Sequence, residues 1–188
     1  MAILVGDALQ AHAYGVLTQA GGPGTPAGIR ALLVRDLATA SGAGGMAGGQ
    51  ALDMAATGTV PDASTLELIN GLKTGCLLEA AVLMPARLQP DLPPGDRQGL
   101  ARFARAIGLA FQIADDLIDI ESPAALTGKP QGSDERNGKR TWPLLVGATA
   151  ARQRLAELER EARIALQPIA RPADGLLWLC ERAVHRDR

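Results

Sequence analysis

Three aspartates interrupt an otherwise apolar stretch, FQIADDLIDI, at residues 111–120. They are Asp115, Asp116 and Asp119, and on a helix turning about 100° per residue they share one side with Gln112. The rest of the circumference is apolar almost all round, which is typical of a helix inside a protein. We therefore predict that this acidic stripe faces an interior site; the alternative is an ordinary solvated face.

Closely spaced carboxylates repel one another, and burying them without a partner destabilises the fold. A divalent cation removes both penalties. Hard oxygen ligands with no histidine or cysteine nearby suit Mg²⁺, which usually completes its shell with water and phosphate oxygens. The stripe therefore predicts Mg²⁺ as cofactor and a substrate that carries phosphate.

Lysine is rare in this chain, and its placement points to the same site. Only three of the 19 basic residues are lysines: Lys73, Lys129 and Lys139. Lys73 lies in the helical pattern before the acidic one, and the other two flank the loop after it. If that loop folds back over the stripe, all three ammonium groups converge on a metal-bound phosphate. The alternative is three scattered surface lysines.

The elements that must position these residues are helical nearly throughout. Helical patterns cover 2–18, 27–56, 65–84 and 97–121, with short helices over 141–187 and loops at 85–96 and 122–140. Ser64 and Glu67 have the spacing of a capping box at the start of the third pattern. The glycines at 42–49 favour close helix packing. With no strand alternation and no repeat, we predict an all-α bundle of long helices, a single domain over 1–188.

Composition excludes several classes of protein. The net charge of −1 and the aromatic content of 3% argue against nucleic acid as a partner. No apolar run reaches the length of a membrane span, and MAILVGDALQ lacks the basic region and cleavage site typical of a signal peptide, so we do not expect it to be one. Two distant cysteines fit a reducing, cytoplasmic setting. The start, AILVGDALQAHAYGVL, reads as the interior of a buried helix without a cap, so we expect that something upstream is missing.

At the acidic stripe the sequence resembles the trans-prenyl diphosphate synthases, the farnesyl and geranylgeranyl diphosphate synthase family. GLAFQIADDLIDI and GKPQGSDERNGKRTWP are similar to the family's second aspartate-rich motif and the lysine-bearing loop after it. GMAGGQALDM and LKTGCLLEAAVLM are similar to two further motifs, in the right order. AILVGDALQ resembles the helix that follows the first aspartate-rich motif.

The resemblance implies a role for each matching position. Asp115 would ligate Mg²⁺ directly, joined by Asp134, and two further carboxylates would act through metal-bound water or as ligands: Asp116 and Asp119. Three lysines would hold the allylic diphosphate: Lys73, Lys129 and Lys139. The site near the allylic carbon would be lined by Thr74 and Gln112. Two more residues would face the same cavity: Gln50 and Asp53.

The implied fold is of the isoprenoid synthase type, and the implied activity is a Mg²⁺-dependent prenyltransferase. It would ionise an allylic diphosphate, condense the cation with isopentenyl diphosphate and eliminate a proton. In the family, the first aspartate-rich motif lies just upstream of AILVGDALQ. We therefore expect the C-terminal portion of a synthase, impaired or inactive alone, that forms a homodimer or pairs with a chain supplying the missing half.

Two alternatives come from other classes. One is a non-catalytic helical subunit that binds a full-length synthase. The other is a class I terpene cyclase, which also ionises allylic diphosphates; the lysine-bearing loop and LKTG argue against it.

Overall fold

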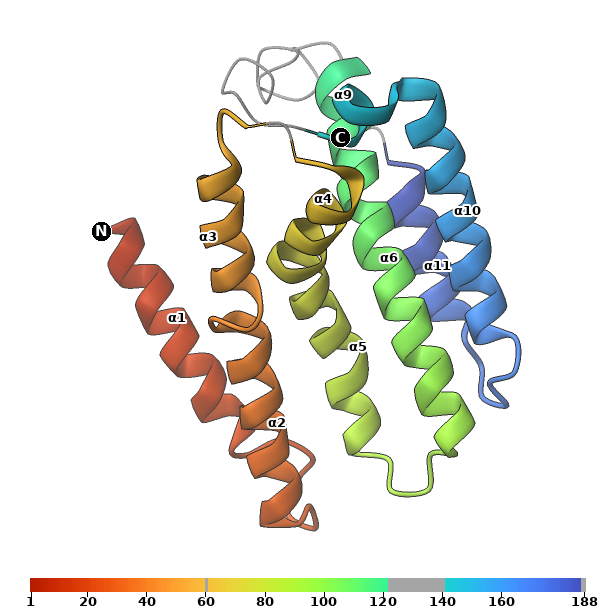
Figure 1. The fold of residues 1–188 in the computed structure, drawn as a ribbon. Coiled ribbons are helices and arrows are strands. Elements are labelled where there is room, and N and C mark those ends of the chain that lie inside the picture. The colour runs from red at the N-terminus through yellow and green to blue at the C-terminus, as the bar shows by residue number, and fades with distance from the viewer. Residues whose placement is uncertain (60, 122–140, 187–188) are drawn as a thin grey trace.

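The computed structural model describes residues 1–59, 61–121 and 141–186, and over these ranges the chain is helical with no β-strand (Figure 1). In chain order the elements are α1 (Ala2–Leu17), α2 (Ala27–Ser41), α3 (Met46–Ala56), α4 (Ala63–Asn70), the π-helical turn η1 (Gly71–Gly75), α5 (Cys76–Arg87), α6 (Pro94–Glu121), α9 (Trp142–Val146), α10 (Ala148–Leu166) and α11 (Asp174–Val184). The prediction of an all-α bundle of helices is confirmed.

Helix α6 is the centre of the packing. Its apolar residues recur every three or four positions, so they form one face that is buried: Phe103, Ile107, Ala110, Ile113 and Leu117. This face packs mainly against α10, with α9 and α11 completing the core, while α5 and η1 lie on the other side of α6 (Figure 1). The prediction that the acid-bearing helix lies inside the protein is therefore confirmed along most of its length.

The glycine-rich segment divides a helix that the sequence pattern predicted as continuous. The prediction of one helix over 27–56 is wrong, because α2 ends at Ser41 and α3 begins at Met46. Gly42 has an extended backbone, with φ −80° and ψ −161°. Glycine pays the largest backbone entropy in a helix, so a glycine-rich run is a natural place for the chain to turn.

The predicted capping box is also wrong. Asp62, not Ser64, caps α4: its carboxylate accepts a hydrogen bond from the Thr65 backbone N–H at 2.7 Å. The Ser64 hydroxyl donates to the same carboxylate at 2.9 Å. Aspartate and serine are comparable N-cap residues, and here the helix simply begins two residues earlier than predicted, at Ala63.

Two further boundaries differ from prediction. The loop predicted at 85–96 is shorter, because α5 continues through Pro85 to Arg87 and α6 begins at Pro94. Pro94 occupies the first position of α6, where the missing N–H of a proline leaves no helical hydrogen bond unmade. The tail is not made of short helices alone, since α10 has 19 residues.

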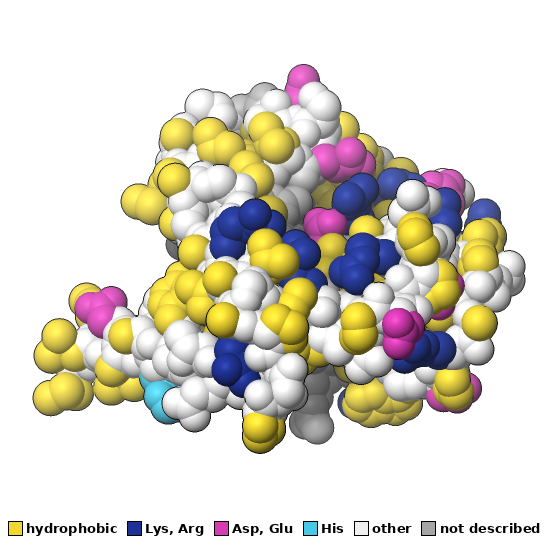
Figure 2. All heavy atoms as spheres, turned by 90° about the horizontal axis from the view of Figure 1, so that it is seen from below, with side chains coloured by type: hydrophobic (Ala, Val, Ile, Leu, Met, Phe, Trp, Pro, Cys, Tyr) yellow, Lys and Arg dark blue, Asp and Glu magenta, His cyan; other side chains and the backbone are white. Residues whose placement is uncertain are grey.

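Helix α1 lies at the outer edge of the bundle and is exposed. None of its residues is buried, and Ile3 is 80% exposed although the sequence reads as a buried helix. It packs beside α2, where Gln10 Nε2 donates to Ser41 Oγ at 3.1 Å. Figure 2 shows α1 projecting from the body with apolar side chains on its surface. Over the described ranges, no helix is both long and apolar enough to cross a membrane.

Candidate active site

The turn η1 carries Lys73 and Thr74 and departs from α-helical geometry. The Cys76 backbone N–H donates to the Gly71 carbonyl, five residues back, so one residue is looped out of the α-helical register. Turns of this kind occur frequently at functional sites. Burial raises the pKa of the adjacent Cys76 thiol, with a smaller contribution from the charge of Glu79, so this cysteine stays a neutral thiol.

Glycines on the two neighbouring helices let them approach η1 closely. A Cβ built on Gly49 of α3 would lie 2.3 Å from the Lys73 backbone N, closer than such atoms can approach. A Cβ built on Gly108 of α6 would lie 3.0 Å from Gly75 Cα. The predicted close helix packing at the glycine run is confirmed at Gly49. Backbone contact on both sides therefore fixes where Lys73 and Thr74 lie.

Lys73 is paired with Asp53 of α3. Lys73 Nζ lies 2.6 Å from Asp53 Oδ2, and both side chains are largely buried, 30% and 19% exposed. Gln50 lies three residues before Asp53 on the same helix and is exposed. The structure thus brings Lys73 and Asp53 into direct contact and leaves Gln50 on the surface of the described chain.

A chain of hydrogen bonds runs from η1 across α6 to the start of α9. Thr74 Oγ1 donates to Gln112 Oε1 at 3.1 Å, and Gln112 Nε2 donates to Asp116 Oδ1 at 3.0 Å. The other oxygen of Asp116 accepts from the Trp142 backbone N–H at 3.0 Å. Asp116 is 2% exposed. A buried carboxylate that accepts two protein hydrogen bonds orients its donors, so the side-chain amide of Gln112 is held with a fixed direction.

The other two carboxylates of the stripe have different surroundings. Asp115 is 55% exposed and pairs with Arg186, whose Nη2 lies 2.8 Å from Asp115 Oδ1. Asp119 follows one helical turn later and is half-buried. The stripe is therefore divided between one carboxylate turned inward and two that lie nearer the surface.

The stripe offers the ligand chemistry that Mg²⁺ prefers, namely carboxylate oxygens without histidine or thiolate. Asp115 and Asp119 would supply ligands from this helix, and no group of three potential ligands occurs over the described ranges. Mg²⁺ commonly keeps several waters and binds through one or two carboxylates plus phosphate, so the donor set fits. Three predicted site residues lie outside the described residues: Lys129, Asp134 and Lys139.

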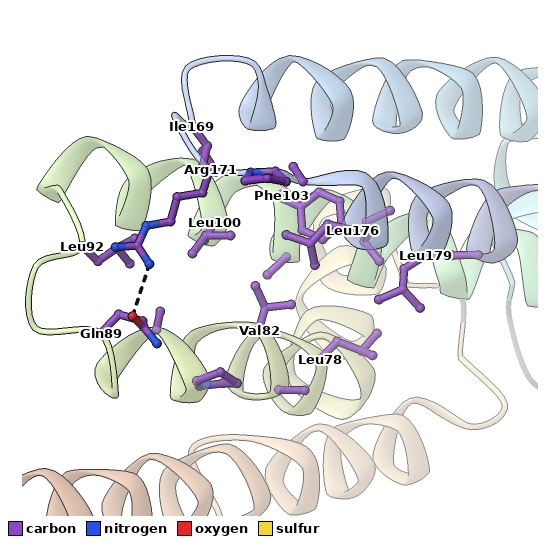
Figure 3. Close-up of a pocket in the computed structure, with 18 of the residues that line it drawn as sticks. Leu78, Val82, Gln89, Leu92, Leu100, Phe103, Ile169, Arg171, Leu176 and Leu179 are labelled. Atoms are coloured by element: carbon purple, nitrogen blue, oxygen red, sulfur yellow. Dashed lines mark hydrogen bonds between the residues drawn. The ribbon is translucent and has the colours of Figure 1, made fainter. Parts of the chain in front are cut away.

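An apolar groove of about 670 Å³ runs along α6 beside the stripe, between α5 and α11 (Figure 3). Its walls include Val82 of α5, Phe103 of α6 and Leu176 of α11. At one end Arg171 reaches across to Gln89, donating from Nη1 to Oε1 at 3.2 Å (Figure 3). Phe111 also lines the groove, so the groove meets the acidic stripe one helical turn before Asp115.

Two contacts of the site were missed by sequence reasoning. Trp142 contacts Asp116 through its backbone N–H, a group that almost every residue has, so the sequence gives no indication of this contact. Arg186 lies 71 residues from Asp115 along the chain, and its position depends on how α11 packs. The charge of Arg186 near the end of the chain is the one signal that could have indicated it.

Comparison with known proteins matches residues 1–166 to the family model described as polyprenyl synthetase. The farnesyl diphosphate synthase of Escherichia coli is 41% identical over 169 residues, covering 90% of this chain and 56% of that protein. An FPP/GFPP synthase from Zymomonas mobilis is 38% identical, with a TM-score of 0.82 over 97% of this chain and 60% of that one. A geranyltransferase from Helicobacter pylori, complexed with magnesium and isoprenyl diphosphate, is 28% identical with a TM-score of 0.79, covering 97% and 58%.

The chain thus spans a little over half the length of the relatives it matches. The structural match covers 97% of this chain, and the family match covers every described element from α1 to α10. The resemblance read from the aspartate-rich and LKTG segments is therefore confirmed. The chain belongs to the polyprenyl synthetase family.

Proposed function

We propose that this chain carries part of the active site of a Mg²⁺-dependent prenyltransferase that condenses isopentenyl diphosphate with an allylic diphosphate. The observation that carries the proposal is the hydrogen-bonded chain from Thr74 through Gln112 to Asp116, beside Lys73 on η1. Family membership and the magnesium and isoprenyl diphosphate bound to the Helicobacter pylori relative support the same chemistry. All of residues 1–188 would form one domain of that enzyme.

In this reading Lys73 is the diphosphate-binding cation on η1. Its partner Asp53 holds the ammonium group in place before substrate arrives, and a diphosphate would compete with that carboxylate for the charge. Lys129 and Lys139 would bind the same diphosphate. Stabilising the charge that develops on the leaving group is the electrostatic part of catalysis, which accounts for much of the rate enhancement of enzymes.

Asp115 and Asp119 are the carboxylates that would hold Mg²⁺ on α6, with Asp134 as the third predicted ligand. When bound, Mg²⁺ would act as a Lewis acid on the diphosphate oxygens. Asp116 remains a predicted contributor through metal-bound water. The hydrogen bonds that it accepts from Gln112 and from the Trp142 backbone favour a positioning role, because they orient the amide of Gln112 and connect α9 to α6.

The reaction needs a polar site next to an apolar one. The allylic C–O bond would break with its electron pair leaving on the diphosphate, and the double bond of isopentenyl diphosphate would attack the allylic carbon. The released diphosphate would then accept the proton whose loss forms the new double bond. Thr74 and Gln112 would line the site at that carbon with their oxygens, while apolar helix faces exclude water that would quench the cation. Gln50 and Asp53 would border the same cavity from α3.

The direct test is isothermal calorimetry of the 188-residue chain with an allylic diphosphate analogue, with Mg²⁺ and with EDTA. Asp115→Ala should weaken the Mg²⁺-dependent part of binding by at least about tenfold, the scale seen when groups around a metal site are removed. The matched control is Asp91→Ala, an exposed aspartate in the loop between α5 and α6, which should bind as the wild type does. Equal Mg²⁺-dependent binding by Asp115→Ala and the wild type would refute the assignment of Asp115 as a Mg²⁺ ligand.

Turnover is tested separately, because the chain spans only part of its relatives. We expect the chain alone to condense radiolabelled isopentenyl diphosphate much more slowly than a full-length synthase of the family. Turnover at the rate of such a synthase would overturn this expectation while leaving the site assignment intact.

A second candidate is a helical subunit that pairs with another chain, either a second copy or a synthase. The exposed apolar side chains of α1 favour it, including Ile3, Leu4 and Leu9, which are 80%, 65% and 62% exposed. Light scattering after gel filtration decides between a monomer and a pair. A wild-type pair that lacks turnover, and that forms equally well in Asp115→Ala, would favour the subunit role over the enzyme.

A further inference from the structure

The segment that follows α11, called the C-terminal tail below, contacts the acidic stripe through the side chain of Arg186. Arg186, two residues after α11 ends, donates from Nη2 to the Phe111 carbonyl at 3.2 Å and to Asp115 Oδ1 at 2.8 Å. Its guanidinium carbon lies 4.0 Å from the centre of the Phe111 ring. The Arg186 side chain is only 17% exposed. A cation buried against an aromatic face and a carboxylate is a defined docked position, not a loose surface contact.

We propose that Arg186 is an internal counter-ion that competes with Mg²⁺ for Asp115, so that metal binding and docking of the C-terminal tail oppose each other. This inference rests on the metal role of Asp115 in the proposed function. It adds regulation of that site by a side chain from the segment that follows α11.

The competition follows from the geometry at Asp115. Arg186 Nη2 occupies Oδ1 at hydrogen-bond distance, and Mg²⁺ binds carboxylate oxygens at about 2.0–2.1 Å. A metal on either oxygen of this carboxylate would therefore sit within a few ångströms of the guanidinium. Two positive charges so close repel strongly in a partly buried site, so the docked tail lowers the affinity for the metal.

The docked state is nevertheless weak enough to be displaced. Arg186 Nε is buried without a hydrogen-bond acceptor, which destabilises the docked position. Asp115 is 55% exposed, so water screens its pairing with Arg186. Phe111 and its carbonyl can hold the guanidinium only in part once Asp115 binds a metal. We therefore expect a small coupling, about two- to fivefold in metal affinity, the range of a partly exposed ion pair.

Other charged residues lie near the contact between Arg186 and Asp115, so the test needs a control for the removal of a positive charge. Asp119 lies one turn beyond Asp115 on α6, and Arg182 lies one turn before Arg186 on α11, where it borders the apolar groove. Removing any nearby positive charge strengthens cation binding slightly. Arg182→Gln is therefore the matched control for Arg186→Gln, because both remove one charge from the same end of the molecule.

The experiment is a titration of the full chain with Mn²⁺ alone, followed by electron paramagnetic resonance of the free ion. Arg186→Gln should bind Mn²⁺ about two- to fivefold more tightly than Arg182→Gln. Phe111→Leu keeps every charge but removes the aromatic face, and it should shift the affinity in the same direction. Equal affinities for Arg186→Gln and Arg182→Gln would overturn the proposal.

Thermodynamic reciprocity supplies a second readout that does not depend on activity. If Mn²⁺ weakens the docking of Arg186, hydrogen exchange at the backbone amides of residues 183–186 should accelerate when the wild type binds Mn²⁺. In Arg186→Gln that exchange should already be fast and should not respond to Mn²⁺. Exchange in the wild type that is unchanged or slowed by Mn²⁺ would also overturn the proposal.

Mn²⁺ binding by Asp115→Ala and by the two arginine variants separates the proposed metal site from the competition for it. Binding of Mn²⁺ that is the same in wild type and Asp115→Ala rejects the proposed metal site, and the competition with it. Binding that depends on Asp115, together with no difference between Arg186→Gln and Arg182→Gln, rejects only the competition.

Discussion

Replacing Gly49 with alanine tests whether close helix packing fixes the turn that carries Lys73. The Cβ of Gly49→Ala would lie 2.3 Å from the Lys73 backbone N, 2.7 Å from its Cα and 2.8 Å from the Leu72 carbonyl carbon. All three are main-chain atoms, so no side-chain rotation can relieve the overlap. Ordinary contact begins at 3.4 Å, so α3 and η1 must separate by about 1 Å.

Two opposing effects set the size of the expected loss. Overpacking a well-packed interior destabilises by about 1–3 kcal/mol, and a clash with rigid backbone belongs at the upper end of that range. Alanine gains about 1 kcal/mol over glycine in a helix interior. The loss from overpacking exceeds the gain in helix propensity, so the net destabilisation is about 2 kcal/mol. In a chain of this size that lowers the melting temperature by about 4–8 °C.

The assay is thermal unfolding followed by circular dichroism at 222 nm, with Gly71→Ala as the matched control. Gly71 is also helical and lies in η1, but a Cβ built there meets nothing within 4 Å. Gly71→Ala should therefore raise the melting temperature by about 2–4 °C. A Gly49→Ala protein that melts at or above the wild type would refute the contact between α3 and η1.

Two further changes test the hydrogen bonds that stabilise the fold around the site. Asp116→Asn should cost about 2 kcal/mol, because its amide nitrogen would face the donor of Gln112 or Trp142, and urea unfolding measures the loss. Asp62→Asn keeps a capping side chain but should lose the part of the stability that depends on the charge of Asp62. The hydrogen bond from the Thr65 backbone N–H lowers the pKa of Asp62, so the wild-type advantage is present above the unfolded-state pKa of 3.8 and is lost as the pH falls through the folded-state value. An advantage that persists unchanged at pH 2 would contradict this assignment.

The helix that carries the acids could be predicted from sequence because its signal is local. Apolar residues at spacings of three and four, as at Phe103, Ile107 and Ala110, predict one buried face whatever packs on it. The same periodicity placed Gln112 and Asp116 on one side, and the structure joins them by a hydrogen bond one turn apart. Local periodicity could not say that Asp116 turns inward while Asp115 stays exposed.

What the sequence could not predict depends on contacts between distant segments. The π-helical geometry of η1 has no periodic signature, since a single five-residue hydrogen bond leaves the apolar pattern almost unchanged. The N-cap at Asp62 was missed because two residues of comparable capping strength stand two positions apart. The docking of Arg186 on Phe111 follows from how α11 packs against α6, which no short-range pattern encodes.

Packing between distant segments also holds the described polar side chains of the candidate site in place. Lys73 is held by one carboxylate on α3, Gln112 by one carboxylate on α6, and each of these contacts is fixed by a glycine or a buried hydrogen bond next to it. Preorganised groups act on developing charge without reorganising, which is where electrostatic catalysis gains most. Asp115 differs, because it is 55% exposed and its partner Arg186 has a buried Nε without an acceptor. The carboxylate proposed to bind metal is thus more exposed than Asp53, the partner of Lys73, and a cation entering the site would compete with Arg186 for it.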